Sequence, residues 1–93
     1  MELEVPEHIL RRLSNLSRKD RERIKKKLDD IDHKISELNI EPQKVIEKRL
    51  RRKLHPFLQQ RVGSWRLWFR EDKENNILHL VAVKSKKEAE REY

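Results

Sequence analysis

The clearest pattern along the chain is a stripe of apolar residues spaced as on a helix. Isoleucine or leucine recurs every three or four positions, at Ile24, Leu28, Ile31, Ile35 and Leu38, and charged residues occupy most positions between them. Ser17, with Asp20 three residues later, has the pattern of a helix N-cap. The sequence therefore predicts a helix that begins after Ser17 and ends at Asn39.

A second, shorter stripe predicts another helix just upstream, from Glu7 onwards. Its apolar positions are Ile9, Leu10, Leu13 and Leu16. The two helices are expected to form a hairpin. A free-standing coiled coil is the alternative, but the longer stripe spans only about two heptads, which favours a helix packed on a sheet.

The second half of the chain has the patterns of strands and turns. Residues Trp65 to Arg70 alternate between two faces, and Ile77 to Val83 is apolar on both faces except at His79, as in a covered strand. The remaining predicted elements are an edge strand at Glu2–Val5, a strand at Phe57–Val62, a turn at Gly63–Ser64, a hairpin loop at Glu71–Asn76, and a short third helix that begins at Pro42 and has Val45, Ile46, Arg49 and Leu50 on one face.

Helices grouped before strands predict an α+β fold, with a small antiparallel sheet packed against an N-terminal helical hairpin. Ninety-three residues correspond to a single domain, residues 1–93. The segment from Lys84 to Tyr93 is a charged tail, for which a short helix is one option.

Composition narrows the classes of function. Charged residues make up 44% of the chain, and no apolar run approaches the roughly 20 residues of a membrane-spanning helix. The first residues lack the pattern of a signal peptide, so we expect a cytoplasmic protein without a membrane partner. The chain has no cysteine, and its four histidines are scattered over different elements, so neither a metal site nor another cofactor is expected.

The net charge of +7 favours a polyanionic partner. A thermostable protein also carries many charges of both signs, and this is the alternative explanation. Thermostability does not account for the excess of positive over negative charges.

The predicted sheet has one face turned away from the helices, and that face is basic. If Trp65, Leu67 and Phe69 face the helices, the other face carries the cationic residues and a tryptophan that could bind RNA, namely Arg61, Arg66, Trp68, Arg70, Lys84 and Lys86. The arginines are expected to bind phosphate and Trp68 to stack on a base. The alternative is that another segment covers Trp68 and that the arginines pair with Glu71, Glu88 or Glu90.

A second basic region runs from Lys44 to Lys53, with six positive charges against one negative. It contributes five further candidates for RNA binding: Lys48, Arg49, Arg51, Arg52 and Lys53. A solvated helix end is the alternative interpretation of this run.

Three segments together carry a resemblance to a known family. Residues Gln59 to Arg70, with Arg61, Gly63 and Arg66 in order, resemble the strand, turn and strand of the RelE/ParE toxin superfamily. Residues 2–31 are similar to the first strand and helical hairpin of that family. Ile77 to Lys87, followed by Tyr93, resembles its last strand and basic tail with a tyrosine.

This resemblance implies a small antiparallel sheet packed on two helices and a toxin that a cognate antitoxin neutralises. RelE-type members are metal-independent endoribonucleases that cleave mRNA, often on the ribosome, and ParE-type members inhibit DNA gyrase. By the same resemblance, Arg61, Arg66 and Lys87 would hold the scissile phosphate as catalytic residues, and Tyr93 would stack on or orient a base.

The chain also departs from the family pattern. Gln59 stands where a basic residue is common, Lys87 stands where the family has arginine, and His55 and His79 are acid/base candidates by chemistry alone. A catalytically weak or inactive RNA-binding module and a ParE-like gyrase inhibitor are therefore the alternatives to an endoribonuclease. The endoribonuclease hypothesis requires Arg61 and Arg66 to converge on an open sheet surface.

Overall fold

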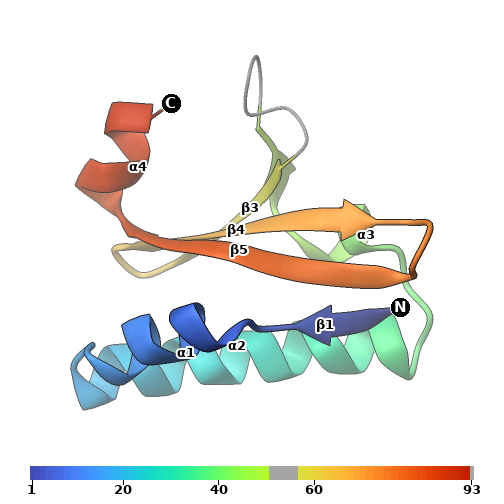
Figure 1. Ribbon diagram of the computed structural model, residues 1–93, viewed down its shortest axis with the longest axis horizontal. Helices are drawn as coiled ribbons and strands as arrows, with labels where there is room; N and C mark the ends of the chain where they lie inside the picture. The colour runs from blue at the N-terminus through green and yellow to red at the C-terminus, as the bar shows by residue number, and fades with distance from the viewer. Residues whose placement is uncertain (51–56, 93) are drawn as a thin grey trace.

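The computed structural model describes residues 1–50 and 57–92, and in it a five-stranded sheet lies between helices (Figure 1). The strands are β1 (Glu2–Glu4), β2 (Lys48–Arg49), β3 (Phe57–Val62), β4 (Trp65–Asp72) and β5 (Ile77–Ser85). The helices are α1 (Glu7–Ser14), α2 (Arg18–Ser36), α3 (Pro42–Val45) and α4 (Lys86–Glu92). The prediction of an α+β fold with an N-terminal helical hairpin is confirmed.

The sheet is mixed, with the strand order β1-β5-β4-β3-β2. Strands β2 to β5 pair antiparallel, whereas β1 pairs parallel to β5. The prediction of a wholly antiparallel sheet was therefore wrong at this edge. A parallel pair needs a long crossover between its strands, and here all the chain between β1 and β5 supplies it.

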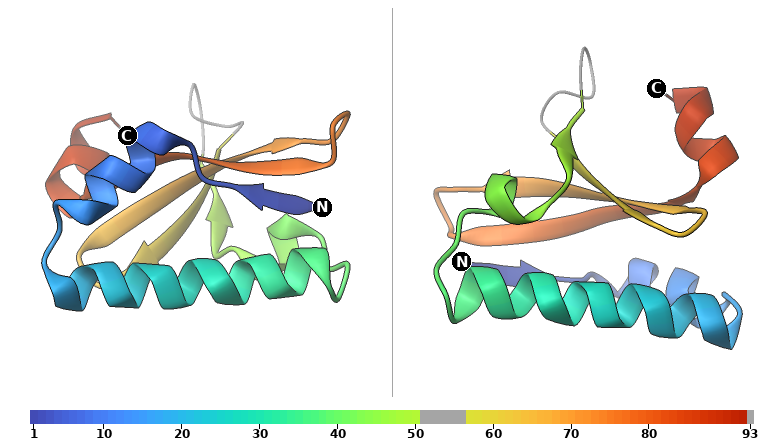
Figure 2. Two further views of the ribbon diagram at one scale, coloured as in Figure 1. Left: turned by 60° about the horizontal axis from the view of Figure 1, so that its bottom comes forward. Right: turned by 180° about the vertical axis from the view of Figure 1, so that it is seen from behind.

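Helices α1 and α2 cover one face of the sheet, as Figure 2 shows from two sides. Ser17 caps α2 as predicted, since its side chain accepts a hydrogen bond of 3.2 Å from the Asp20 amide. The apolar stripe of α2 is buried at Ile24, Ile31 and Ile35, each 0% exposed, against residues of β3, β4 and β5. Leu38 is 55% exposed, because the helix ends at Ser36.

The third helix is shorter than predicted. It ends at Val45, and Ile46 already has the extended conformation, with φ −93° and ψ 139°. The chain then pairs with β3 as strand β2, so the predicted helical face shared with Arg49 was wrong. Pairing with the edge of β3 satisfies backbone groups that the end of a helix would leave open.

Two residues with positive φ make the hairpin turns. Gly63 lies between β3 and β4 with φ 59°, and Asn76 lies between β4 and β5 with φ 58°, as the turn patterns predicted. Asp72 accepts hydrogen bonds from the backbone and the side chain of Asn75. These bonds lower the pKa of Asp72, because they stabilise its charged form.

A small apolar cluster lies on the outer face of the sheet, opposite α1 and α2. Trp68 pairs with Ala82 while Phe69 pairs with Leu80, so Val81 is an extra residue in β5, and a β-bulge results. The cluster contains Leu50, Trp68 and Ala89, with Phe57, Val81 and Ala82 packed against it. Because Ala89 belongs to α4, this helix covers part of the face that the sequence predicted to be open (Figure 2).

Candidate anion-binding hollow

A hollow with a volume of about 220 Å³ opens on the outer face of the sheet, and we call it the central hollow. Its walls come from β2, β3, β4 and α4, through Lys48, Gln59, Arg66, Lys86, Ala89 and Glu90. Sites for drug-sized ligands measure roughly 300–1,000 Å³, so this volume suits a smaller group. Among the described residues that line it, three side chains are cationic and one is a carboxylate, so the hollow favours an anion.

The hairpin turn between β3 and β4 positions Arg66 in the central hollow. Its Nη1 donates hydrogen bonds to the carbonyls of Gly63 (3.1 Å) and Trp65 (3.0 Å). No carboxylate pairs with Arg66 among residues 1–50 and 57–92. A guanidinium has five N–H donors in a planar fork, so the groups that do not contact these carbonyls are suited to a phosphate.

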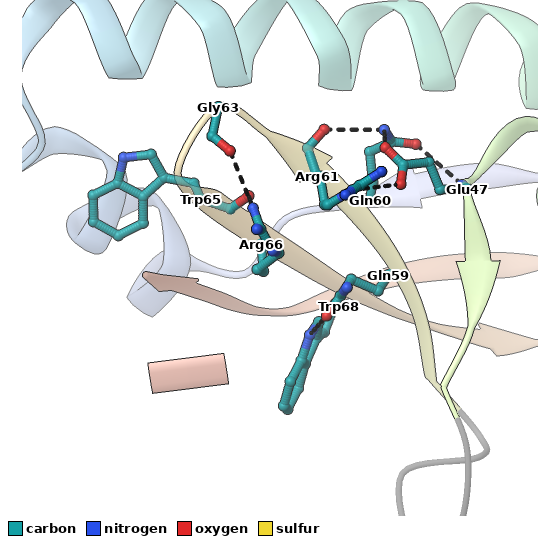
Figure 3. A network of polar contacts seen from close by, with 8 residues as sticks. All are labelled: Glu47, Gln59, Gln60, Arg61, Gly63, Trp65, Arg66 and Trp68. Atoms are coloured by element: carbon teal, nitrogen blue, oxygen red, sulfur yellow. Dashed lines mark hydrogen bonds and ion pairs between the residues drawn. The ribbon is translucent and has the colours of Figure 1, made fainter. Parts of the chain in front are cut away.

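Arg61 lies directly opposite Arg66 in the strand register, but its side chain takes another direction (Figure 3). Its Nε donates a 2.9 Å hydrogen bond to Oε2 of Glu47. It lines a different hollow, on the side of α2. The prediction that Arg61 and Arg66 converge was therefore wrong, because like charges facing each other repel and Glu47 offers Arg61 an opposite charge.

Glu47 is held in place by Gln60, as the dashed lines in Figure 3 show. Gln60 Nε2 donates to Glu47 Oε1 at 3.1 Å, and the Glu47 amide donates to Gln60 Oε1 at 3.2 Å. Gln60 is only 5% exposed, so these bonds satisfy a buried polar side chain. Glu47, the acidic partner of Arg61, is thus held by a network of hydrogen bonds.

Trp68 is buried at 2% exposure, so the prediction that it stacks on a base was wrong and the alternative of a covered side chain is confirmed. Its Nε1 donates a 2.8 Å hydrogen bond to Gln59 Oε1. Its ring stacks on Phe57 with centroids 6.0 Å apart, and Lys84 Nζ lies 5.3 Å from its centroid. Ala89 of α4 shares the outer apolar cluster with Trp68, a contact that strand alternation does not reveal.

The orientation of α4 separates the neighbouring lysines Lys86 and Lys87. Lys86, predicted to bind RNA, lines the central hollow with Arg66. Lys87, predicted to be catalytic, is exposed and does not line it. Successive residues on a helix point about 100° apart, so only one of the two can face the hollow. The structure thus favours Lys86 where the sequence favoured Lys87.

The other predicted RNA-binding residues are distributed over both faces. Lys48 lines the central hollow, and Arg70 is exposed on β4 outside it. Arg49 pairs in register with Leu58, a residue of the main core, and forms a 3.3 Å ion pair with Glu71. Arg49 therefore lies on the helix side of the sheet, away from the hollow. Four further predicted residues, Arg51, Arg52, Lys53 and Tyr93, and also His55, lie outside the described residues.

A capping box fixes the start of α4. The Ser85 amide donates to Glu88 Oε1 at 2.9 Å, and the Glu88 amide donates to Ser85 Oγ at 3.2 Å. Arg12 adds an ion pair with Glu88 at 2.6 Å, which ties α4 to α1. The bond from the Ser85 amide, more than any other contact, lowers the pKa of Glu88, so the capping carboxylate is charged at neutral pH.

Three residues of this region were not predicted as site residues: Gln59 and Glu90 in the central hollow, and Glu47 beside Arg61. The spacing of Ser85 and Glu88 is that of a capping box and predicts the start of α4. A helix that begins there brings Glu90 onto the same face as Lys86. Nothing in the sequence indicates that Glu47 pairs with Arg61, since they are 14 residues apart.

The described ranges contain neither a helix that could span a membrane nor a cluster of metal ligands. No helix among them has the length and apolar character that crossing a membrane requires. No group of three or more histidine, cysteine, aspartate or glutamate side chains is arranged there to hold a metal ion.

The mixed sheet with the helical hairpin on one face gives this small α+β domain a RelE-like fold. The chain is similar to one chain in the crystal structure of the toxin-antitoxin complex RelBE2 from Mycobacterium tuberculosis, with a TM-score of 0.68 and 20% sequence identity. The similarity covers 90% of this chain and 95% of that chain. No protein-family model and no curated protein matches the sequence. At this identity the likeness establishes the fold.

Proposed function

We propose that this protein is a RelE-type toxin that binds mRNA and cleaves it as a metal-independent endoribonuclease, with the central hollow as its phosphate site. The observation that carries the proposal is the meeting of Lys48, Arg66 and Lys86, from three different elements, around one hollow of about 220 Å³. The RelE-like fold and the net charge of +7 support it. We also propose that the protein acts in the cytoplasm, on mRNA at the ribosome.

In this proposal the cations hold the scissile phosphodiester and offset the charge that develops in the transition state. The 2′-oxygen of the ribose attacks phosphorus, the bond from phosphorus to the 5′-oxygen breaks, and a 2′,3′-cyclic phosphate forms. The attacking hydroxyl loses a proton to a base, and the leaving 5′-oxygen gains one. Glu90 is the one carboxylate that lines the central hollow in the described part of the chain, so we assign it the role of the base.

From the sequence, cleavage required Arg61 to converge with Arg66. We withdraw this requirement, because Lys48 and Lys86 share the central hollow with Arg66. Arg61, with its guanidinium on Glu47, is not part of the phosphate site that we propose. Gln59 lines the central hollow, but its Oε1 accepts the Trp68 hydrogen bond. Arg66 is therefore the principal phosphate ligand, and Lys48 and Lys86 assist it.

The test compares two neighbouring lysines of α4. Purified protein is incubated with mRNA in EDTA, with and without ribosomes, and the products are mapped. Arg66→Ala should reduce the cleavage rate by about 10²–10³, the usual effect of removing one group that stabilises transition-state charge. Lys86→Ala should reduce it markedly, and Lys87→Ala, the matched control, should not. The reverse result for the two lysines would overturn the assignment of the central hollow as the phosphate site. Glu90→Gln tests whether Glu90 is the base.

A second candidate is an RNA-binding module of the same fold that does not cleave. The hydrogen bond of Arg61 to Glu47 favours it, because it takes one of the two arginines predicted to hold the phosphate out of the hollow. Binding that weakens with salt and with Arg66→Ala, without any cleavage product, would support this candidate. Inhibition of DNA gyrase by the wild type, with no effect on RNA, would contradict both and support a ParE-like inhibitor.

We also propose a cognate antitoxin as a protein partner. The structurally similar RelBE2 is itself a toxin-antitoxin complex, and the cationic surface of this chain is complementary to an acidic segment. The expected partner is partly disordered and carries an amphipathic helix. Co-expression with the neighbouring reading frame should yield a stable complex that suppresses cleavage; a neighbouring product that does not copurify would count against it.

A further inference from the structure

A second basic hollow lies between α2 and the β3–β4 hairpin, and the proposed function does not use it. This lateral hollow has a volume of about 450 Å³. It is lined by Arg23, Lys26, Lys27, Asp30, Gln60, Arg61, Val62 and Gly63. We propose that it is a second phosphate-binding site, which holds the backbone of a folded RNA while the central hollow holds the strand to be cut. The choice of RNA as the ligand rests on the proposed function.

Helical spacing brings the cations of the lateral hollow together. Arg23, Lys26 and Lys27 are three and four residues apart, so they share one flank of α2, beside the buried stripe. Arg61 faces them from β3. Four cations therefore surround one carboxylate, Asp30, in this hollow.

The opposite flank of α2 shows that this excess of cations is not a general feature of the helix. The hollow on that side, toward α1, has the charged residues Arg21, Lys25, Asp29 and Asp32. Its charges balance, with two of each sign. A helix that merely needed a solvated surface would have no reason to differ between its flanks, so the asymmetry indicates a partner on one side.

The ion pairs of the lateral hollow leave part of its charge uncompensated. Lys27 lies 4.0 Å from Asp30, which also pairs with Lys34, and Arg61 pairs with Glu47. In the part of the chain that the structure describes, neither Arg23 nor Lys26 forms an ion pair. Both are exposed. These two residues are the ones that a bound anion would contact at least cost to the fold.

The turn at Gly63 contributes to the shape of the site. A Cβ atom built on Gly63 would lie 3.4 Å from Nη1 of Arg23, an ordinary van der Waals distance, so this guanidinium lies beside the hairpin turn. The Arg23 guanidinium of α2 thus lies next to the hairpin that carries Arg61 and Arg66. The central and lateral hollows thus lie on two sides of one hairpin, where a single long RNA can reach both.

The chemistry of the lateral hollow favours an RNA backbone over a base. No aromatic side chain of residues 1–50 and 57–92 lines it, so these residues offer no surface on which a base could stack. Exposed lysine and arginine side chains bind phosphates largely through release of counterions, without reading sequence. We therefore expect the site to add affinity for long, base-paired RNA and to leave a short single strand unaffected.

The experiment compares charge reversals on the two flanks of α2. Arg23→Glu with Lys26→Glu removes the uncompensated cations of the lateral hollow. Arg21→Glu with Lys25→Glu makes the same change of net charge on the opposite flank and is the matched control. Binding of a long, base-paired RNA is measured over a range of salt concentrations, and cleavage of a short single-stranded RNA is measured in parallel. Thermal melting checks that both variants are folded.

The lateral double variant should lose about tenfold or more in affinity for the long RNA, and its salt slope should fall by about 1.4–1.8, since each phosphate contact contributes about 0.7–0.9. Cleavage of the short RNA should stay at the wild-type rate. Equal losses in both double variants would show an effect of net charge alone and overturn the proposal. Unchanged RNA affinity, together with loss of a copurifying acidic protein, would assign the surface to that protein instead.

The outcome is distinguishable from a failure of the proposed function. If Arg66→Ala has no effect on RNA while the lateral variant still loses affinity, the central hollow is misassigned and the lateral site stands. If only Arg66→Ala has an effect, the lateral site is wrong and the proposed function stands.

Discussion

Replacing Trp68 with phenylalanine tests whether this side chain supports the fold or binds RNA. Trp68 is 2% exposed, stacks on Phe57, and shares the outer cluster with Leu50 and Ala89. Its indole donates the 2.8 Å hydrogen bond to Gln59 Oε1. Phenylalanine keeps much of the ring packing but removes this donor. We expect the variant to be less stable and to bind RNA normally once folded.

The size of the effect follows from the burial of the acceptor. Gln59 is 6% exposed, so its amide oxygen loses a partner where water has little access. An unsatisfied buried polar group costs about 1–3 kcal/mol. In a chain of 93 residues, each kcal/mol lowers Tm by about 4–8 °C. Trp68→Ala, which also removes the ring, should cost about 3–5 kcal/mol.

Urea denaturation followed by circular dichroism measures the loss, and the midpoint should fall with an unchanged m-value. Replacing Gln59 as well, with methionine, should recover part of the stability, because the donor and acceptor are then removed together. RNA titration of Trp68→Phe at a temperature where it is folded completes the test. An unchanged urea midpoint with a tenfold loss of RNA affinity would refute the structural role and restore base stacking.

Three further predictions concern the turn, the core and the cap of α4. Gly63→Ala should destabilise the protein by about 1–2 kcal/mol, since Gly63 has φ 59°, and urea denaturation measures this. Ile31→Ala should cost about 2–5 kcal/mol in the same assay, because Ile31 is 0% exposed; a loss well below 1 kcal/mol would contradict its place in the core. The lowered pKa of Glu88 means that its charged form stabilises the cap. This contribution is present above the ordinary glutamate pKa of about 4.3 and disappears as the pH falls through the lowered value. As the pH is lowered, the wild type should therefore lose more helix content than Glu88→Gln. At pH 7, the cap of Glu88→Gln should be weaker than that of the wild type.

The two helices of the N-terminal hairpin follow directly from the sequence. The stripe from Ile24 to Ile35 and the cap at Ser17 predict α2, because helix periodicity and capping are local properties. The turns at Gly63 and Asn76 are equally local, since they require residues that tolerate positive φ. These features needed no knowledge of the rest of the chain.

Two features of the sheet depended on contacts between distant segments. Strand β2 replaced part of a predicted helix because β3 offered an open edge to Lys48 and Arg49. The bulge at Val81 placed two consecutive apolar residues on the outer face and so extended the cluster around Trp68. Secondary-structure propensity predicts neither strand β2 nor the bulge, because both depend on which backbone groups of a distant segment lie opposite the strand.

The site shows the same division between local pattern and tertiary contact. Charge and alternation in the sequence predicted a cationic outer face with Arg66 and Lys86, and the basic run from Lys44 to Lys53 made Lys48 a further candidate. Only the tertiary structure decided which cations share a hollow. Arg61 turned to Glu47, 14 residues away, and the rotation of α4 selected Lys86 over Lys87. The direction of a long side chain is set by the nearest opposite charge in space, and that neighbour is known only after the chain has folded.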